Sequence, residues 1–90
     1  QETLKIKYCF KLIARFEDSA KDVHILMKTL GVLIHVSEHY ENKKLLVECG
    51  IFDIMTLLLQ NKNGAIVREA AAIIGNILHK PAGMVELLIL

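Results

Sequence analysis

The 90-residue sequence predicts an all-α protein built from stacked helical repeats. Hydrophobic residues recur three or four positions apart along most of the chain, which is the spacing of amphipathic helices. No segment shows the strict alternation of a half-buried strand. The sequence also resembles itself after a shift of 44 residues, and internal periods of this size indicate a solenoid of about two units here.

The composition indicates which partners the protein could bind and where in the cell it would be found. The chain is 53% hydrophobic and only 6% aromatic, which suits an aliphatic helical core. A net charge of +1 gives no excess of positive charge, so we expect neither nucleic acid nor a membrane as partner. No apolar run reaches the roughly 18 residues of a membrane span. Cys9 and Cys49 lie far apart without a CxxC spacing and are interpreted as buried thiols, with a disulfide or a metal role as the alternative. We therefore expect an intracellular protein, cytoplasmic or nuclear.

The first predicted helix covers residues up to about 16. Its bases, Lys5, Lys7, Lys11 and Arg15, occupy faces away from the apolar stripe, and we interpret them as a solvated face in preference to a binding patch. The predicted inward stripe consists of Leu4, Tyr8, Cys9, Leu12, Ile13 and Phe16.

Two further helices follow with start and stop signals. Ser19 with Asp22 resembles a capping box, which starts a helix that runs to about Ser37. Asn42 is placed to cap a short helix through "KKLLVEC". Gly50 should end this short helix in a left-handed conformation, because glycine has no Cβ to clash there. The inward stripe predicted for the longer helix consists of Val23, Leu26, Met27, Leu30 and Ile34.

The last two predicted helices are separated by "NKNG". One covers "IFDIMTLLLQ", and the other runs from Ala65 to about Lys80, where Pro81 forces a break. The inward positions predicted for the second of these are Val67, Ala70, Ala71, Ile74 and Leu78.

The internal repeat aligns two of these helices position by position. A shift of 44 residues places Gly31 over Gly75 and His35 over His79. Glycine is costly inside a helix, so we interpret Gly31 and Gly75 as packing positions that let a neighbouring helix approach. The core stripe coincides as well, through the pairs Val23/Val67, Leu26/Ala70, Leu30/Ile74 and Ile34/Leu78.

The stretch from "LGVLIHVSEHYENKKLLVECG" to "VREAAAIIGNIL" resembles the armadillo family. It carries a third helix, then N-x-x-x-L-x-x-x-G through a short first helix, a second helix ending in "LLL", and another third helix containing "GN". The resemblance implies an armadillo-like right-handed α-solenoid, and we expect a piece of a longer protein. A HEAT array is the nearest alternative, but HEAT repeats usually lack the short first helix. The expected division is residues 1–18 as the end of a preceding repeat, 19–37 as its third helix, 42–80 as one complete repeat, and 81–90 as the start of the next.

The resemblance also implies a binding surface. In the family the third helices line a concave groove, where the Asn of "GN" hydrogen-bonds the backbone of an extended peptide. Asn76 occupies this position and is expected to be exposed, whereas its repeat equivalent is Val32. Where nuclear-import adaptors carry Trp, the chain has Lys28 and Ala72, which disfavours basic nuclear-localisation peptides. Together with His24 and Arg68 these positions give a mildly basic groove, suited to a protein or peptide segment that is acidic or mixed in charge.

A competing interpretation comes from His35-Val36-Ser37-Glu38-His39, which matches the zinc-peptidase pattern H-x-x-E-H. A catalytic zinc needs a third protein ligand, and His24 and His79 are poorly placed to supply it. The repeat register accounts for the whole match as a helix end and an exit turn. We therefore expect no enzyme activity, no metal and no cofactor, and we keep the metallopeptidase as a distant alternative.

Two functional hypotheses remain open. The first is a protein-interaction module or scaffold that binds a protein segment along the third helices. The second is a structural spacer within a longer solenoid whose ligands bind other repeats. Asn76 favours the first hypothesis and Val32 favours the second. The uncapped ends of the repeats are also a place where copies of the chain could associate with one another.

Overall fold

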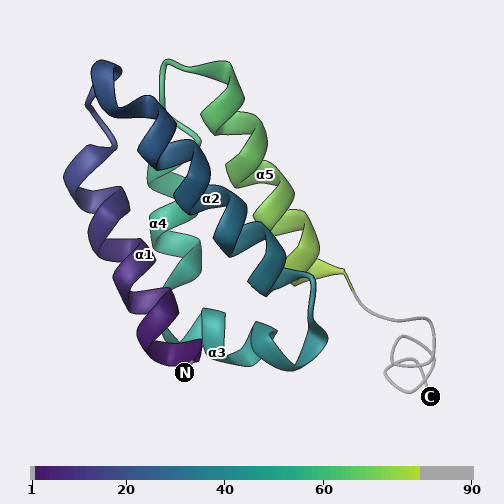
Figure 1. Ribbon diagram of the computed structural model, residues 1–90. Helices are drawn as coiled ribbons and strands as arrows, with labels where there is room; N and C mark the ends of the chain where they lie inside the picture. The colour runs from purple at the N-terminus through teal and green to yellow at the C-terminus, as the bar shows by residue number, and fades with distance from the viewer. Residues whose placement is uncertain (1, 80–90) are drawn as a thin grey trace.

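The computed structural model describes residues 2–79, and every regular element in this part of the chain is helical (Figure 1). The main helices are α1 (Glu2–Phe16), α2 (Val23–Ser37), α3 (Lys43–Glu48), α4 (Ile51–Leu58) and α5 (Gly64–Leu78). Short 3₁₀ turns, Ala20–Asp22 and Tyr40–Asn42, precede α2 and α3. The predicted all-α class is confirmed, and the expected break at Pro81 lies outside the described residues.

The helices form two layers. In Figure 1, α2 and α5 lie side by side and run in the same direction, while α1 and α4 lie on the other side of them. Helix α2 packs against both α1 and α5, α4 packs against α5, and the short α3 crosses one end of the layers. The two helices that the 44-residue shift aligns are therefore stacked side by side as α2 and α5.

One continuous core joins the layers. All five helices contribute to it, so neither pair of long helices has a separate core. The predicted stripes are displaced at several positions: Ile6, Ile66 and Ile73 are buried, whereas Ala71 is exposed and Leu78 is 65% exposed. Leu4 and Tyr8, also predicted to face inward, are exposed. The buried apolar residues are Ile6, Cys9, Ile13, Leu26, Leu30, Leu33, Val36, Leu46, Ile51, Met55, Leu58, Ile66, Ala70, Ile73 and Ile77.

The helix ends agree with the sequence signals in part. Gly50 separates α3 from α4 with φ of 91°, the left-handed conformation that was predicted. The side chain of Asn63 caps α5 by accepting a hydrogen bond from the Ala65 backbone at 2.9 Å. Asn42 makes no cap bond, since its Nδ2 donates to the carbonyl of Val36 at 3.2 Å. Ser19 donates to the Asp22 carboxylate at 2.8 Å and likewise forms no side-chain cap.

The interpretation of Gly31 and Gly75 as packing glycines is wrong for the described residues. A Cβ placed on either residue would meet no heavy atom within 4 Å outside the backbone of its own helix. Both glycines lie on exposed faces, Gly31 on α2 and Gly75 on α5. Both glycines do lie inside helices, as the periodicity predicted, but no neighbouring helix packs closely against either of them among the described residues.

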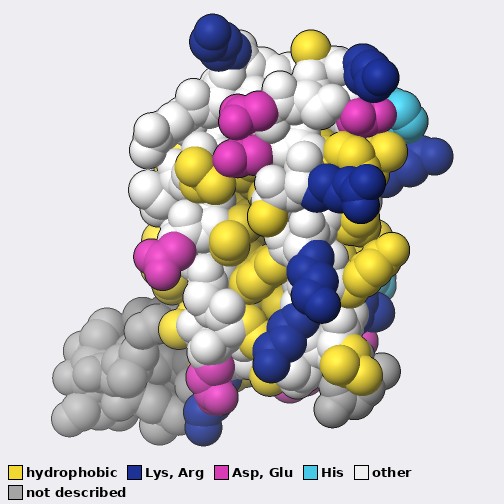
Figure 2. All heavy atoms as spheres, turned by 90° about the vertical axis from the view of Figure 1, so that its left-hand side faces the viewer, with side chains coloured by type: hydrophobic (Ala, Val, Ile, Leu, Met, Phe, Trp, Pro, Cys, Tyr) yellow, Lys and Arg dark blue, Asp and Glu magenta, His cyan; other side chains and the backbone are white. Residues whose placement is uncertain are grey.

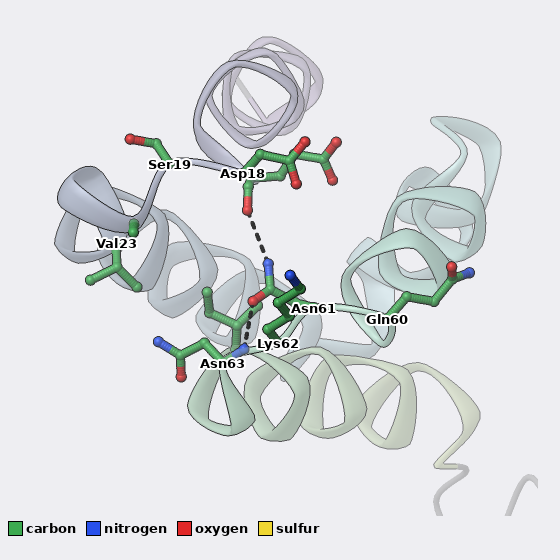
Figure 3. Close-up of a pocket in the computed structure, with 10 residues that line it drawn as sticks. Asp18, Ser19, Val23, Gln60, Asn61, Lys62 and Asn63 are labelled. Atoms are coloured by element: carbon green, nitrogen blue, oxygen red, sulfur yellow. Dashed lines mark hydrogen bonds between the residues drawn. The ribbon is translucent and has the colours of Figure 1, made fainter.

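The loops after α1 and after α4 are stacked on each other (Figure 3). Asn61 Nδ2 donates to the carbonyl oxygen of Glu17 at 2.9 Å, and these two residues are 44 positions apart in the sequence. Asn61 Oδ1 accepts from the backbone nitrogen of Asn63 at 2.8 Å, so the same side chain shapes its own loop. The bond therefore joins two positions that the 44-residue shift makes equivalent.

Candidate partner-binding surface

The six sequence-predicted site residues occupy two columns on neighbouring helices. His24, Lys28 and Val32 follow one another at four-residue spacing on α2, and all three are exposed. Arg68, Ala72 and Asn76 form the corresponding column on α5, where Arg68 and Ala72 are exposed. Since α2 packs on α5, the structure places both columns on adjacent helices of one layer.

Asn76 is partly buried and not exposed as expected. Its Nδ2 donates to Ser37 Oγ at 3.0 Å, and Ser37 donates in turn to the carbonyl of Ile34 at 2.7 Å. Ser37 has no exposed surface, so this short chain of hydrogen bonds lies between α5 and the last turn of α2. The carboxamide of Asn76 keeps its Oδ1 and one N–H for other partners.

A groove of about 730 Å³ lies between α1 and α2. Two of the predicted residues, Lys28 and Val32, line its α2 wall, and Tyr8 and Leu12 line its α1 wall. The structure therefore brings part of the α2 column together with α1, which the sequence reasoning did not anticipate. The full lining consists of Lys5, Tyr8, Cys9, Leu12, Lys28, Thr29, Gly31, Val32, His35 and Val36.

Helix α1 is strongly basic on its surface. It contains Lys5, Lys7, Lys11 and Arg15 with a single acid, Glu2, and all four bases are exposed. Figure 2, which views the molecule from the side on which α1 lies in Figure 1, shows Lys and Arg side chains in a line beside hydrophobic side chains. The one ion pair of α1 among the described residues joins Lys5 Nζ to Glu2 Oε1 at 3.1 Å. This helix therefore presents a positive field to an approaching ligand.

The histidines of the H-x-x-E-H match lie together at the end of α2 without forming a metal centre. His35 Nδ1 is 3.5 Å from Glu38 Oε1, and the rings of His35 and His39 meet edge to face with centroids 5.3 Å apart. Within residues 2–79, no three His, Cys, Asp or Glu side chains are gathered in a way that could hold a metal ion. Nothing here supports the metallopeptidase alternative.

The two cysteines are free thiols in different surroundings. Cys9 is buried at the floor of the groove between α1 and α2, and burial raises the pKa of its thiol, while the nearby Lys5 lowers that pKa by a smaller amount. Cys49 is partly buried beside the core. The raised pKa keeps Cys9 protonated at neutral pH, which is the unreactive form of the thiol.

Sequence reasoning missed the residues that shape the groove and fix Asn76. Tyr8 was assigned to the core, yet it is 64% exposed on the groove wall. Ser37 was interpreted only as an exit turn, although it accepts the bond from Asn76. Gly31 gave no usable signal for the groove, because a helical glycine suggested close packing in the sequence, whereas in the structure it meets no neighbour within 4 Å.

Comparison with known proteins identifies the repeat. Residues 39–79 match the family model described as an armadillo/beta-catenin-like repeat. This segment contains α3, α4 and α5, so the resemblance to the armadillo family and the armadillo-like α-solenoid class are confirmed. No curated protein and no solved structure matches the chain.

The matched repeat indicates a coarse functional class. Armadillo repeats generally mediate protein–protein interactions, which makes a protein-interaction or scaffold module the functional class that the match indicates. The family is generally non-enzymatic. Within the described residues, no helix combines the length and the apolar character needed to cross a membrane.

Proposed function

We propose that this chain, which carries an armadillo repeat at residues 39–79, binds a protein segment along the exposed sides of α2 and α5. The observation that carries the proposal is the pairing of these two helices side by side, each with a column of residues at four-residue spacing that are exposed except for the partly buried Asn76. The ligand would cross both helices and meet the two columns in turn, as an extended segment does in a solenoid groove.

The columns favour an acidic or mixed ligand. Lys28 and Arg68 supply the charged positions beside the polar His24, and Glu69, which follows Arg68 in the sequence, is only partly exposed. Exposed charges of one sign contribute to the rate of encounter and to specificity more than to affinity. Val32 and Ala72 leave room for apolar side chains of the ligand between the charged positions.

Asn76 is the proposed contact for the ligand backbone. Its bond to Ser37 fixes the orientation of the carboxamide before a ligand arrives, so less side-chain entropy is lost on binding. The free Oδ1 and N–H can then pair with one backbone N–H and one backbone C=O of an extended segment. Val32 offers no such pair at the equivalent position of α2, and the proposed site has a single polar contact of this kind.

We also propose the division of the chain into repeats. Residues 1–18 and 19–37 then supply the second and third helices of a preceding repeat, and residues 42–80 form one complete repeat. The bond between Asn61 and Glu17 supports this division, because it links equivalent loops 44 residues apart. The proposed start of the next repeat, residues 81–90, lies outside the described residues.

Peptide selection followed by titration tests the binding function. Extended 12-residue peptides selected against the chain from a displayed random library would be titrated by calorimetry against wild type, Lys28→Glu, Arg68→Glu and Asn76→Ala. We expect each variant to weaken binding by about 1 to 2 kcal/mol, and added salt to weaken the wild-type complex. Lys11→Glu is the charge-matched control on α1 and should change affinity by less than about 0.5 kcal/mol. If selection yields no binder, or if the three variants bind like wild type, the structural-spacer hypothesis replaces this one.

A further inference from the structure

We propose that the segment bound along α2 and α5 carries a proline over Val32, two residues away from the ligand residue whose backbone pairs with Asn76. This inference rests on the proposed function and specifies the ligand further. It follows from the unequal chemistry of two equivalent positions, from the polar side chains near Val32, and from the spacing of backbone groups in an extended segment.

Val32 and Asn76 are equivalent positions with opposite chemistry. The 44-residue shift aligns them, and they lie on the neighbouring helices α2 and α5. Asn76 keeps its Oδ1 and one N–H for a ligand, whereas the side chain of Val32 has no polar atom. Val32 is 41% exposed, so a ligand that pairs with Asn76 and continues across α2 meets an apolar surface there.

Stacking of a further repeat would leave part of Val32 accessible. Asn76 keeps part of its surface exposed, although α2 packs against α5 and Ser37 accepts a hydrogen bond from the Asn76 side chain. A repeat that packed against α2 in the same way would cover Val32 to a similar extent, since the two positions are equivalent. The ligand surface at Val32 therefore does not depend on the chain ending at α1.

A ligand N–H over Val32 finds no free side-chain acceptor on α2. The polar side chains of α2 within one turn of Val32 are Lys28, Thr29 and His35. Lys28 can only donate, and Thr29 is buried and donates to a carbonyl of its own helix at 2.8 Å. His35 directs its Nδ1 at Glu38 Oε1 over 3.5 Å. An N–H over Val32 would lose water and gain no hydrogen bond in return, which is unfavourable.

The spacing of an extended segment identifies the ligand residue that lies over Val32. In extended backbone the N–H and C=O groups of residues i and i+2 point to the same side, and two residues span about 7 Å. Packed helices such as α2 and α5 have axes about 8 to 10 Å apart. The residue two positions from the Asn76 contact therefore presents its N–H to Val32. The direction of the ligand decides whether this residue precedes or follows the contact.

Proline suits this position because it has no N–H to leave unpaired. Its φ of about −65° belongs to an extended polyproline II backbone, and it also restricts the preceding residue to extended conformations. The segment would therefore lose less conformational freedom on binding. The pyrrolidine ring adds apolar contact with the exposed part of Val32.

A proline scan of the library-selected peptides tests the inference. Each internal position is replaced in turn by proline and by alanine, and binding to wild type and to Val32→Asn is measured by calorimetry. Proline should weaken binding to wild type by about 10-fold at the position paired with Asn76, and Asn76→Ala should remove this penalty, which identifies the position. Two residues away, proline should bind wild type at least as tightly as alanine. Val32→Asn supplies a partner for the N–H, so proline should there bind this variant about 10-fold more weakly than alanine.

Val32→Ala is the matched control, because it shortens the apolar side chain without adding a polar group. Its proline scan should agree with that of wild type within about 2-fold. Circular dichroism should show the same helicity for wild type and both variants of Val32. If proline binds wild type more weakly than alanine at both positions two residues from the Asn76 contact, or if Val32→Asn creates no new proline-sensitive position, the inference is wrong and the proposed function stands. If no selected peptide responds to Asn76→Ala, Lys28→Glu or Arg68→Glu, the proposed function fails and the inference fails with it.

Discussion

Asn76 of α5 donates its Nδ2 hydrogen to Ser37 Oγ of α2 over 3.0 Å, and this bond ties the two parallel helices together beside the core. Ser37 is fully buried and passes its own hydrogen to the Ile34 carbonyl. The residue that the armadillo resemblance assigns to ligand binding is therefore also a structural contact between helices. Loss of Asn76 would affect folding and binding together, and the two effects need separate measurements.

We expect Asn76→Ala to lower the free energy of unfolding by about 1 kcal/mol, because it removes one hydrogen bond and leaves the Ser37 oxygen with an unused acceptor position. Urea denaturation of Asn76→Ala, Ser37→Ala and the double variant measures the coupling between the two side chains. Val32→Ala, at the repeat-equivalent position without such a bond, should change the stability by about 0.5 kcal/mol or less. Additive effects of the two single variants would show that the bond contributes nothing.

Much of the fold could be predicted from the sequence because its signals are local. The glycine at position 50 demands a left-handed backbone, and "NKNG" separates two apolar stripes. The cap of α5 by Asn63 was not predicted. The shift of 44 residues then indicates that α2 and α5 are equivalent, and packing places them side by side. Stripe positions were less accurate at Tyr8 and Leu78, which were expected to face inward and are exposed, since helical spacing cannot tell which flank of a wide apolar face has a neighbour.

The candidate site depended on contacts between helices, and those are not local. Nothing around Asn76 in the sequence indicates that Ser37, 39 residues earlier, accepts its hydrogen bond. The groove needs α1 and α2 together, and Tyr8 and Gly31 become its wall and its hollow only when the two helices pack. The resemblance to a family therefore predicted the columns on α2 and α5, and the pairing of α1 with α2 had to come from the structure.

Gly31→Ala and Gly75→Ala should each raise the free energy of unfolding by about 0.5 to 1 kcal/mol. Both residues lie in helices, both have space for a Cβ, and alanine lowers the conformational entropy of the unfolded chain. Gly50→Ala is the opposite case, because φ of 91° strains any residue that has a Cβ, and it should destabilise by about 1 kcal/mol or more. Thermal unfolding followed by circular dichroism measures all three. If Gly31→Ala instead lowers the stability, Gly31 packs closely against a neighbour, contrary to the structure.

Cys9 should make stability depend on pH in the alkaline range. Burial raises the pKa of its thiol, so the folded state holds this proton more tightly than the unfolded state does. The contribution is fully present below the ordinary pKa of a cysteine and is lost as the pH rises through the raised folded value. The stability difference between wild type and Cys9→Ala should therefore shrink from pH 8 towards pH 10 in urea titrations. A difference that stays constant over this range would mean that burial does not perturb the thiol.

Asn61 gives the sharpest test of repeat stacking, since its Nδ2 bond to Glu17 joins equivalent loops of the two units (Figure 3). Asn61→Asp keeps the oxygen that accepts from the Asn63 backbone, but it loses the donor and places a carboxylate against the Glu17 carbonyl. We expect a loss of about 1 to 3 kcal/mol at neutral pH, which is the range for a polar group left without its partner. Gln60→Ala is the control, because this side chain is exposed and, among the described residues, the hydrogen bond to Glu17 comes from Asn61 instead. It should change stability by less than about 0.5 kcal/mol.

The size of the Asn61→Asp effect at low pH distinguishes two origins of the loss. Protonation of the new carboxyl restores a donor that can reach the Glu17 carbonyl, so the variant should regain part of its stability near pH 3 relative to wild type at the same pH. Guanidinium denaturation at pH 3 and pH 7 makes the comparison. An equal loss at both pH values would mean that the loop has rearranged and that the 44-residue contact is not what holds the two units in register.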